Sequence, residues 1–222
     1  EFRPQETIFT IMSKYFCPHL WNTLNVTPLS YAPCCWYDGI VLTTESNPLK
    51  SKEFDELRTK VLNGEPLEGC RQCYENDEYG VISKRQLGIK KFGDTPPELK
   101  LKELNYAFDN ICNLKCRGCF SAQSHLWKKD EELIFGKSFV QDKLVINNFD
   151  VDLSEIEYIE LSGGEPFLSP KFIPFIQKIK HRLEDINLSI VTNGTILIED
   201  EIIDELKRCK HLGLAISIDG LK

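Results

Sequence analysis

The chain has 222 residues with 41% hydrophobic content, ordinary for a soluble protein, and its length allows one large or two small domains. A net charge of −7 and a pI near 5.3 argue against a nucleic-acid partner, and the lack of a bilayer-length apolar run argues against a membrane one. Nine cysteines without a signal peptide favour reduced thiols that hold metal, and a cytoplasmic protein, over disulfides.

The amino-terminal part has its own cysteine pattern. Cys17 stands alone, Cys34 and Cys35 follow a turn-like stretch, and Cys70 and Cys73 form a CxxC pair. Two distant cysteines and a CxxC pair suffice for a four-thiolate site that holds either an iron–sulfur cluster or zinc. Because neighbouring residues on extended backbone point to opposite faces, we expect one of Cys34 and Cys35 to face this site and the other to be a bystander.

The segment after this hairpin-like stretch predicts a helix over residues 51–62, where apolar residues recur at helical spacing. The basic residues at 84–85 and 90–91 are most simply a solvated linker. Turn-forming residues at 93–97 then suggest a domain boundary. We therefore expect a small cysteine-rich α+β domain over residues 1–95 and a second domain over residues 96–222.

The second domain alternates short apolar runs with longer helical patterns. Strands are expected at 103–108, 156–161, 188–191 and 212–216, with helices at 121–134, 170–182 and 200–211. This order is typical of βαβ units and a parallel sheet, so the predicted fold class is α/β. Cys209 lies on the apolar face of the last helix and is expected to be a buried small hydrophobe.

A loop after the first of these strands carries Cys112, Cys116 and Cys119, with no further cysteine before Cys209. Three thiolates on one loop can bind three irons of a [4Fe–4S] cluster, which leaves the fourth iron without a protein ligand. An open coordination position is typical of a reactive metal site. A structural zinc site is the alternative that this spacing alone leaves open.

Polar and glycine-containing motifs follow the later strands, at the edge where α/β barrels place their chemistry. They are Gly163-Gly164-Glu165-Pro166, Thr192-Asn193-Gly194, and Ser217 with Asp219. Two glycines allow backbone to approach a ligand closely, although the same four residues also suit a simple turn. Ser217 and Asp219 are equally compatible with a helix cap or an Asx turn.

Together the cysteine loop and these strand-end motifs resemble the radical SAM superfamily, over residues 101–222. The resemblance implies a partial (β/α) TIM-like barrel with about four βα units. It implies that Cys112, Cys116 and Cys119 are catalytic ligands of a [4Fe–4S] cluster, and that S-adenosyl-L-methionine binds beside them. The contacts implied with this cofactor come from the residues Gly163, Gly164, Glu165, Pro166, Asn193, Ser217 and Asp219, the last two at its ribose.

The reaction that the resemblance implies is reductive cleavage of S-adenosylmethionine to methionine and a 5′-deoxyadenosyl radical, which abstracts hydrogen from a substrate. It implies an electron donor such as flavodoxin or ferredoxin, and a peptide or protein as the substrate. Two alternatives stay open, since fold does not fix substrate. One is a radical SAM enzyme that acts on a nucleotide or small metabolite, and the other is a non-enzymatic binding module stabilised by zinc or an iron–sulfur cluster.

The amino-terminal cysteines resemble the auxiliary-cluster domain of SPASM and twitch radical SAM proteins. This resemblance implies a second [4Fe–4S] cluster, or zinc, on Cys17, Cys34, Cys70 and Cys73, although in the family such a domain usually follows the barrel. The chain begins with Glu1 and stops at Lys222 directly after the fourth expected barrel strand. We therefore expect a fragment of a longer protein that binds S-adenosylmethionine poorly on its own.

Overall fold

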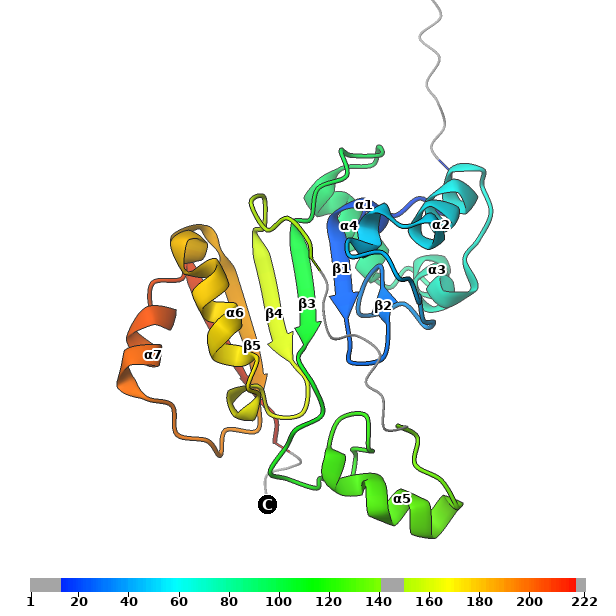
Figure 1. The fold of residues 1–222 in the computed structure, drawn as a ribbon. Helices are drawn as coiled ribbons and strands as arrows, with labels where there is room; N and C mark the ends of the chain where they lie inside the picture. Colours follow the sequence, from blue (N-terminus) through cyan, green and yellow to red (C-terminus); the bar gives the residue numbers. More distant parts are fainter. Residues whose placement is uncertain (1–12, 141–149, 219–222) are drawn as a thin grey trace, which may run out of the picture.

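A computed structural model describes residues 13–140 and 150–218 of the chain, and its centre is a six-stranded sheet in the order β2-β1-β3-β4-β5-β6 (Figure 1). Strand β2 pairs antiparallel with β1, and every other neighbouring pair is parallel. This arrangement confirms the α/β class and the partial barrel. The strands are β1 (Thr23–Val26), β2 (Tyr31–Ala32), β3 (Glu103–Ala107), β4 (Tyr158–Ser162), β5 (Asn187–Thr192) and β6 (His211–Ile216).

Helices surround the sheet on its apolar side and at its ends. No helix in the described ranges is long and apolar enough to cross a membrane. The α-helices are α1 (His19–Asn22), α2 (Lys52–Leu62), α3 (Arg71–Glu78), α4 (Lys84–Phe92), α5 (Lys128–Phe135), α6 (Phe172–Ile179) and α7 (Asp200–Leu206). Short 3₁₀ helices are η1 (Pro48–Lys50), η2 (Glu68–Cys70), η3 (His125–Trp127), η4 (Pro166–Leu168) and η5 (Lys180–Asp185).

The two faces of the sheet differ because side chains alternate along each strand. In β5, Leu188 and Ile190 are buried, whereas the residue before each of them, Asn187 and Ser189, is half-buried. The apolar face packs against α6, which lies over β4 and β5 in Figure 1, and contributes to one large hydrophobic core. The opposite face presents mainly polar side chains, and some of them, such as Glu160 and Ser189, line a cavity.

The amino-terminal segment is built into the same sheet as the barrel strands. Strand β1 pairs in parallel with β3, and Leu24 of β1 and Phe54 of α2 belong to the same core as Leu104. The turn-rich residues 93–97 form the loop between α4 and β3. A division into domains 1–95 and 96–222 stays a prediction, while the sheet and the core run across that position.

Most expected elements form at the expected places, with shifted ends. Helix α2 begins after Ser51, whose hydroxyl accepts a hydrogen bond from the Phe54 N–H at 3.4 Å. The helix expected at 121–134 starts later, because a turn and η3 precede α5. The helix expected at 200–211 ends at Leu206, since β6 begins at His211; Cys209 lies in the turn between them and packs half-buried against the core.

The basic residues at 84–91 do not form a solvated linker; that expectation is wrong. They belong to α4, and the Nζ atoms of Lys84 and Lys91 each lie 2.8 Å from one carboxylate oxygen of Glu103 in β3. Arg85 pairs with Asp77 of α3. Burial acts to raise the pKa of Glu103, but the two lysine hydrogen bonds outweigh it and lower that pKa to about 2. Helix α4 thus joins the amino-terminal segment to the first barrel strand by ion pairs.

Candidate functional site

The cysteine loop, residues 110–120, leaves β3 at the carboxyl edge of the parallel strands. The glycine motif, residues 163–166, leaves β4 at the same edge, and Asn193 follows β5. In Figure 1 α5, which comes after the cysteine loop, lies beyond these strand ends. The topology thus gathers the motifs of three strands at one edge. Asp219 lies outside the described residues.

Hydrogen bonds between its backbone and the side chains of two later residues, His125 and Trp127, hold the cysteine loop in shape. The Cys112 N–H donates to Nδ1 of His125 at 3.3 Å, and Nε1 of Trp127 donates to the Cys116 carbonyl at 3.0 Å. The three loop cysteines are all half-buried free thiols. A loop fixed at its backbone with its thiols at the surface offers three sulfur ligands to a cluster on one side.

The Cys112 sulfur accepts hydrogen bonds from two groups. The Leu114 N–H lies 3.4 Å from Sγ, and Nδ2 of Asn193 lies 3.8 Å from it. The same Asn193 amide donates to Oδ1 of Asn113 at 3.0 Å, and its own Oδ1 accepts from the Thr195 hydroxyl at 2.7 Å. Asn193 therefore links the end of β5 to the cysteine loop.

The two glycines lie directly against the backbone at the start of the cysteine loop. The Gly164 N–H donates to the Asp109 carbonyl at 2.8 Å, and the Glu165 N–H donates to the Ile111 carbonyl at 2.7 Å. A Cβ atom on Gly164 would lie 2.2 Å from the Ile111 carbonyl oxygen, and one on Gly163 2.6 Å from that of Asp109. Glycine is required here for the contact between two loops, besides any contact with a ligand.

The side chain of Glu165 is a buried structural acceptor. Its Oε1 accepts from the Thr192 hydroxyl at 2.9 Å and from the Phe167 N–H at 3.2 Å, while Oε2 accepts from the Asn193 N–H at 2.8 Å. The residue is 1% exposed. Its carboxylate ties the end of β4 to the end of β5 and so positions Asn193. Pro166 begins η4 and is also buried.

Asp109 is a buried acid that sequence analysis did not single out. Its Oδ2 accepts from the Ser169 hydroxyl at 2.6 Å, and its Oδ1 accepts from the Ile111 N–H at 3.0 Å. The residue fixes the start of the cysteine loop to the segment after the glycine motif. The position of Asp109, an acid between an apolar strand and the cysteine loop, was the sequence signal that could have identified it.

A cavity of about 380 Å³ lies at this edge of the sheet. Its walls include Ala107 and Asp109 after β3, Gly163 after β4, and Gln123 after the cysteine loop. The turn of the β1–β2 hairpin, residues 27–29, closes another side. The amino-terminal hairpin thus reaches the edge that carries the candidate chemistry, which the sequence did not indicate.

Ser217 lies at the end of β6, farther along the same edge. Its backbone N–H donates to the Thr192 carbonyl at 2.9 Å, and the residue is exposed. Within the described residues, no side chain forms a hydrogen bond with its hydroxyl. Its contact with a ribose stays a prediction. Phe120, the aromatic next to the last loop cysteine, is 42% exposed.

The amino-terminal thiol set, defined as Cys17, Cys34, Cys70 and Cys73, comes together from four separate places. Cys17 precedes α1, Cys34 follows β2, and the other two lie at the end of η2 and in the first turn of α3. Burial raises the pKa of Cys17, and the other three thiols of the set raise it further. Burial likewise raises the pKa of Cys34 to about 12 and that of Cys70 to about 11. The mutual influence places these thiols in one neighbourhood.

Cys35, next to Cys34 in the chain, lies near a different set of charged groups. It is exposed, and besides burial its pKa responds to Lys84, Glu160 and Glu103. These groups lie on the polar face of the sheet. Within the part of the chain that the structure describes, no three histidine, cysteine or carboxylate side chains are arranged to hold a single metal ion. The donor chemistry of each thiol set nevertheless suits an iron–sulfur cluster, and the metal assignments are treated below as proposals.

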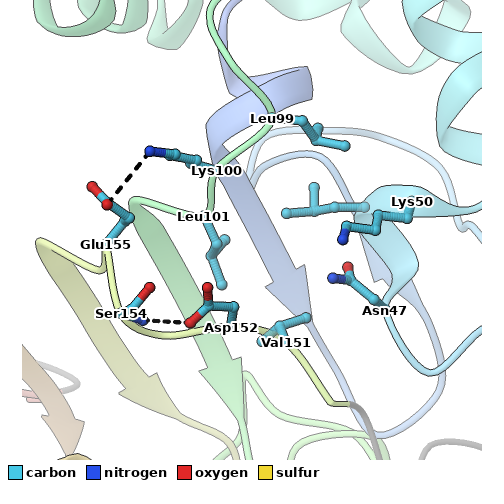
Figure 2. Close-up of a pocket in the computed structure, with 10 residues that line it drawn as sticks. Asn47, Lys50, Leu99, Lys100, Leu101, Val151, Asp152, Ser154 and Glu155 are labelled. Carbon is cyan, nitrogen blue, oxygen red and sulfur yellow. Dashed lines mark hydrogen bonds and ion pairs between the residues drawn. The ribbon is translucent and has the colours of Figure 1, made fainter.

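A further cavity is lined by none of these cysteines. Figure 2 shows it between the segments that lead into β3 and β4, where Leu101, Val151 and Asp152 line it. Lys100 lies 3.5 Å from a carboxylate oxygen of Glu155 at its rim. Because it contains no residue of either thiol set, it is not the candidate catalytic site.

Residues 106–222 match the radical SAM superfamily. Curated relatives include GTP 3′,8-cyclases of Campylobacter jejuni subsp. doylei, 31% identical over 55% of this chain and 36% of the relative, and of Sulfurovum sp., 30% identical over 50% and 32%. GTP 3′,8-cyclase 3 of Mycobacterium bovis is 27% identical over 70% of this chain and 41% of the relative.

The chain thus spans about a third to two fifths of the length of these relatives. No solved structure is significantly similar to it. Because the family match covers more than half of the chain and begins within β3, the strand that leads into the cysteine loop, this protein belongs to the radical SAM superfamily.

Proposed function

We propose that the chain carries the cluster site of an enzyme that cleaves S-adenosylmethionine reductively, with Cys112, Cys116 and Cys119 as the ligands of a [4Fe–4S] cluster. The observation that carries this proposal is the cysteine loop held against the glycine motif by the two backbone hydrogen bonds from Gly164 and Glu165. When bound, the cluster and S-adenosylmethionine supply a 5′-deoxyadenosyl radical, with one electron delivered by a reductant.

The chain's own residues would bind and orient these groups. The three thiols supply sulfur ligands and leave one iron open to the amino and carboxylate groups of the cofactor. Asn193 donates to the Cys112 sulfur, and the 380 Å³ cavity beside the loop offers space next to the cluster site. Backbone groups of the glycine motif would face the methionine end. Ser217 and Asp219 are proposed at the ribose.

We propose a nucleotide or a small nucleotide-like metabolite as the substrate. The curated relatives bear a name that specifies a nucleotide, GTP, and the similarity covers half or more of this chain. The expectation of a peptide or protein substrate has no support from these relatives. An electron donor such as flavodoxin or ferredoxin is proposed, because this superfamily needs an external reductant.

We also propose a second metal centre, a [4Fe–4S] cluster or zinc, on the amino-terminal thiol set. Four thiols in one apolar neighbourhood support it: Cys17 and Cys70 pack with the hydrophobic cluster around Phe16 and Trp21. Buried thiols that bind no metal have no reason to cluster, whereas four thiolates complete the coordination of a zinc ion or of a [4Fe–4S] cluster. Whether this site belongs to a twitch or SPASM-like domain is part of the same proposal.

The cluster proposal is tested by metal analysis after anaerobic reconstitution. Replacing Cys112, Cys116 and Cys119 together by Ala should remove about four irons and about four sulfides per chain and abolish 5′-deoxyadenosine formation. Metal on the amino-terminal set should remain. Unchanged iron and sulfide in this triple variant would refute the assignment.

The second centre is tested by comparing two adjacent cysteines. Cys34→Ser should lower the metal content of the amino-terminal site and destabilise the fold, since site formation and folding are linked. Cys35→Ser is the matched control and should keep the metal. Sulfide analysis then decides between the two metals, because a zinc site contains no sulfide. Equal metal loss in both variants, or in neither, would contradict the ligand assignment.

A further inference from the structure

Three polar side chains form a closed ring of hydrogen bonds where the segment after β5 meets the cysteine loop. Nδ2 of Asn193 donates to Oδ1 of Asn113 at 3.0 Å, and Nδ2 of Asn113 donates to the Thr195 hydroxyl at 2.8 Å. That hydroxyl donates in turn to Oδ1 of Asn193 at 2.7 Å. Each side chain thus donates once and accepts once within the ring, which holds both amides in one orientation.

A backbone group decides which way the Asn193 amide is turned. The Thr195 N–H, which can only donate, lies 3.0 Å from Oδ1 of Asn193. The opposite orientation would set two donors against each other. Oδ1 therefore accepts both bonds from Thr195, and one hydrogen of Nδ2 is used in the ring. The other hydrogen of Nδ2 is available to Sγ of Cys112, which lies 3.8 Å from this nitrogen.

The backbone of Asn193 is held independently of the ring. Its N–H donates at 2.8 Å to Oε2 of Glu165, the buried carboxylate of the glycine motif. The position of the residue is thus set by the backbone, and the direction of its amide by the ring. Both hydrogens and both lone pairs of this amide are engaged by protein groups, so the side chain is directed at the Cys112 sulfur rather than at a small-molecule ligand.

A hydrogen bond to a ligand sulfur affects the reduction potential of an iron–sulfur cluster. The sulfur carries more negative charge in the reduced state, so a donor aimed at it stabilises that state more than the oxidised one. The Leu114 N–H also donates to the Cys112 sulfur, at 3.4 Å, but this donor belongs to the loop itself. Asn193 approaches the same sulfur from another strand of the sheet, and it does so with a side chain.

We infer that Asn193 is a positioning residue that raises the reduction potential of the cluster on the cysteine loop through its hydrogen bond to the Cys112 sulfur. The inference rests on the cluster ligands proposed above. It gives the end of β5 a role in the transfer of one electron from the external reductant, because a higher potential makes the reduced cluster easier to reach.

A redox titration of the reconstituted chain, followed by electron paramagnetic resonance, measures this potential. The signal of the loop cluster is the one that disappears when Cys112, Cys116 and Cys119 are replaced together by Ala. Asn193→Leu removes the donor and nearly keeps the side-chain shape. It should shift the equilibrium about tenfold towards the oxidised cluster, which lowers the potential by about 59 mV for a one-electron couple.

Two further variants separate the donor from the surrounding contacts. Asn193→Asp keeps an acceptor for the Thr195 N–H, removes the donor and adds a negative charge, so its potential should fall at least as far as that of Asn193→Leu. Thr195→Val is the matched control, because it also removes one hydrogen bond of the Asn193 side chain but leaves Nδ2 beside the sulfur. Its oxidised-to-reduced equilibrium should stay within about twofold of that of the unaltered chain.

Iron and sulfide analysis shows which variants carry the loop cluster, and Asn193→Asp decides alone if Asn193→Leu does not incorporate it. A shift below about threefold in the deciding variant, or an equal shift in Thr195→Val, would overturn the inference and leave the cluster ligands standing. Loss of the loop cluster from both Asn193 variants would overturn it too, since the residue would then be structural. If the triple alanine variant keeps every signal, the proposed cluster ligands are wrong and the inference fails with them.

Discussion

Replacing Glu165 by Ala removes the acceptor of three hydrogen bonds at the junction of β4 and β5. The Thr192 hydroxyl is deeply buried and would lose its partner, while the N–H groups of Phe167 and Asn193 are half-buried and can partly reach water. An unpaired buried donor costs about 1–3 kcal/mol. With partial rehydration of two of the three groups, we expect the free energy of unfolding to fall by about 2–4 kcal/mol.

Glu165→Gln separates the effect of the charge from that of the shape. A glutamine side chain keeps one acceptor oxygen, so one of the two backbone N–H groups loses its acceptor whichever way the amide is turned. We expect a loss of about 1–2 kcal/mol for this variant. Glu157→Ala is the control, because its ion pair with Lys102 is only half-buried and lies at the surface, and it should cost less than about 1 kcal/mol.

Urea unfolding under anaerobic conditions measures these differences, and hydrogen exchange of the Asn193 amide reports the local effect. In Glu165→Ala this amide should exchange faster, since its acceptor at 2.8 Å is gone. If Glu165→Ala unfolds within about 1 kcal/mol of the unaltered chain and Asn193 keeps its protection, the carboxylate does not hold the two strand ends together.

Other changes probe separate parts of the fold. Gly164→Ala should destabilise the chain by about 1–3 kcal/mol and lower iron incorporation, because its Cβ meets the Ile111 carbonyl. Gly118→Ala is the control, because a Cβ atom on Gly118 meets open space. Equal iron content in the two variants would contradict the argument from close approach. The Glu103 pKa of about 2 lies below its ordinary value of 4.5, so the stability that this carboxylate contributes is present above about pH 5 and lost towards pH 2. This loss of stability in acid, up to about 3 kcal/mol, should be absent in Glu103→Gln. An identical loss in acid in the variant would refute the stabilising role of Glu103. Arg58→Met should cost about 2–3 kcal/mol in urea unfolding, because the buried guanidinium donates to the Leu20 and Leu49 carbonyls at 2.9 and 2.7 Å, and a loss below about 0.5 kcal/mol would refute that role.

Local pattern predicted the parallel part of the fold well. The strand expected at 188–191 and the helix expected at 51–62 both depend on residues within a few positions of one another, and such signals are visible in a single sequence. The pairing of β1 with β3 is set by contacts between distant segments, and nothing in residues 23–26 alone indicates a parallel partner. The basic residues of α4 were misread for the same reason, since Glu103 lies beyond a loop.

The candidate site also has features that local motifs predict and features that depend on contacts between distant segments. The spacing of the three loop cysteines and the paired glycines identified the family. The structural use of those glycines and of Glu165 depends on which loop lies against which. Gly164 meets the Ile111 backbone, and Glu165 reaches the end of β5, so each contact joins segments that are far apart in sequence. Motifs therefore identified the candidate site, and packing assigned additional roles to the same residues.

The parallel pairing of β1 with β3 has a consequence for the growing chain. Thr23 and Glu103 are register partners although about 80 residues separate them, so β1 has no neighbour on that side until β3 has left the ribosome. At a synthesis rate of about 5–20 residues per second, this interval lasts roughly 4–16 seconds. Of the amino-terminal thiol set, Cys17 emerges before this interval, Cys34 early in it, and Cys70 and Cys73 past its middle. A metal bound by them during synthesis would hold the hairpin and α3 together before the strand that completes their sheet exists.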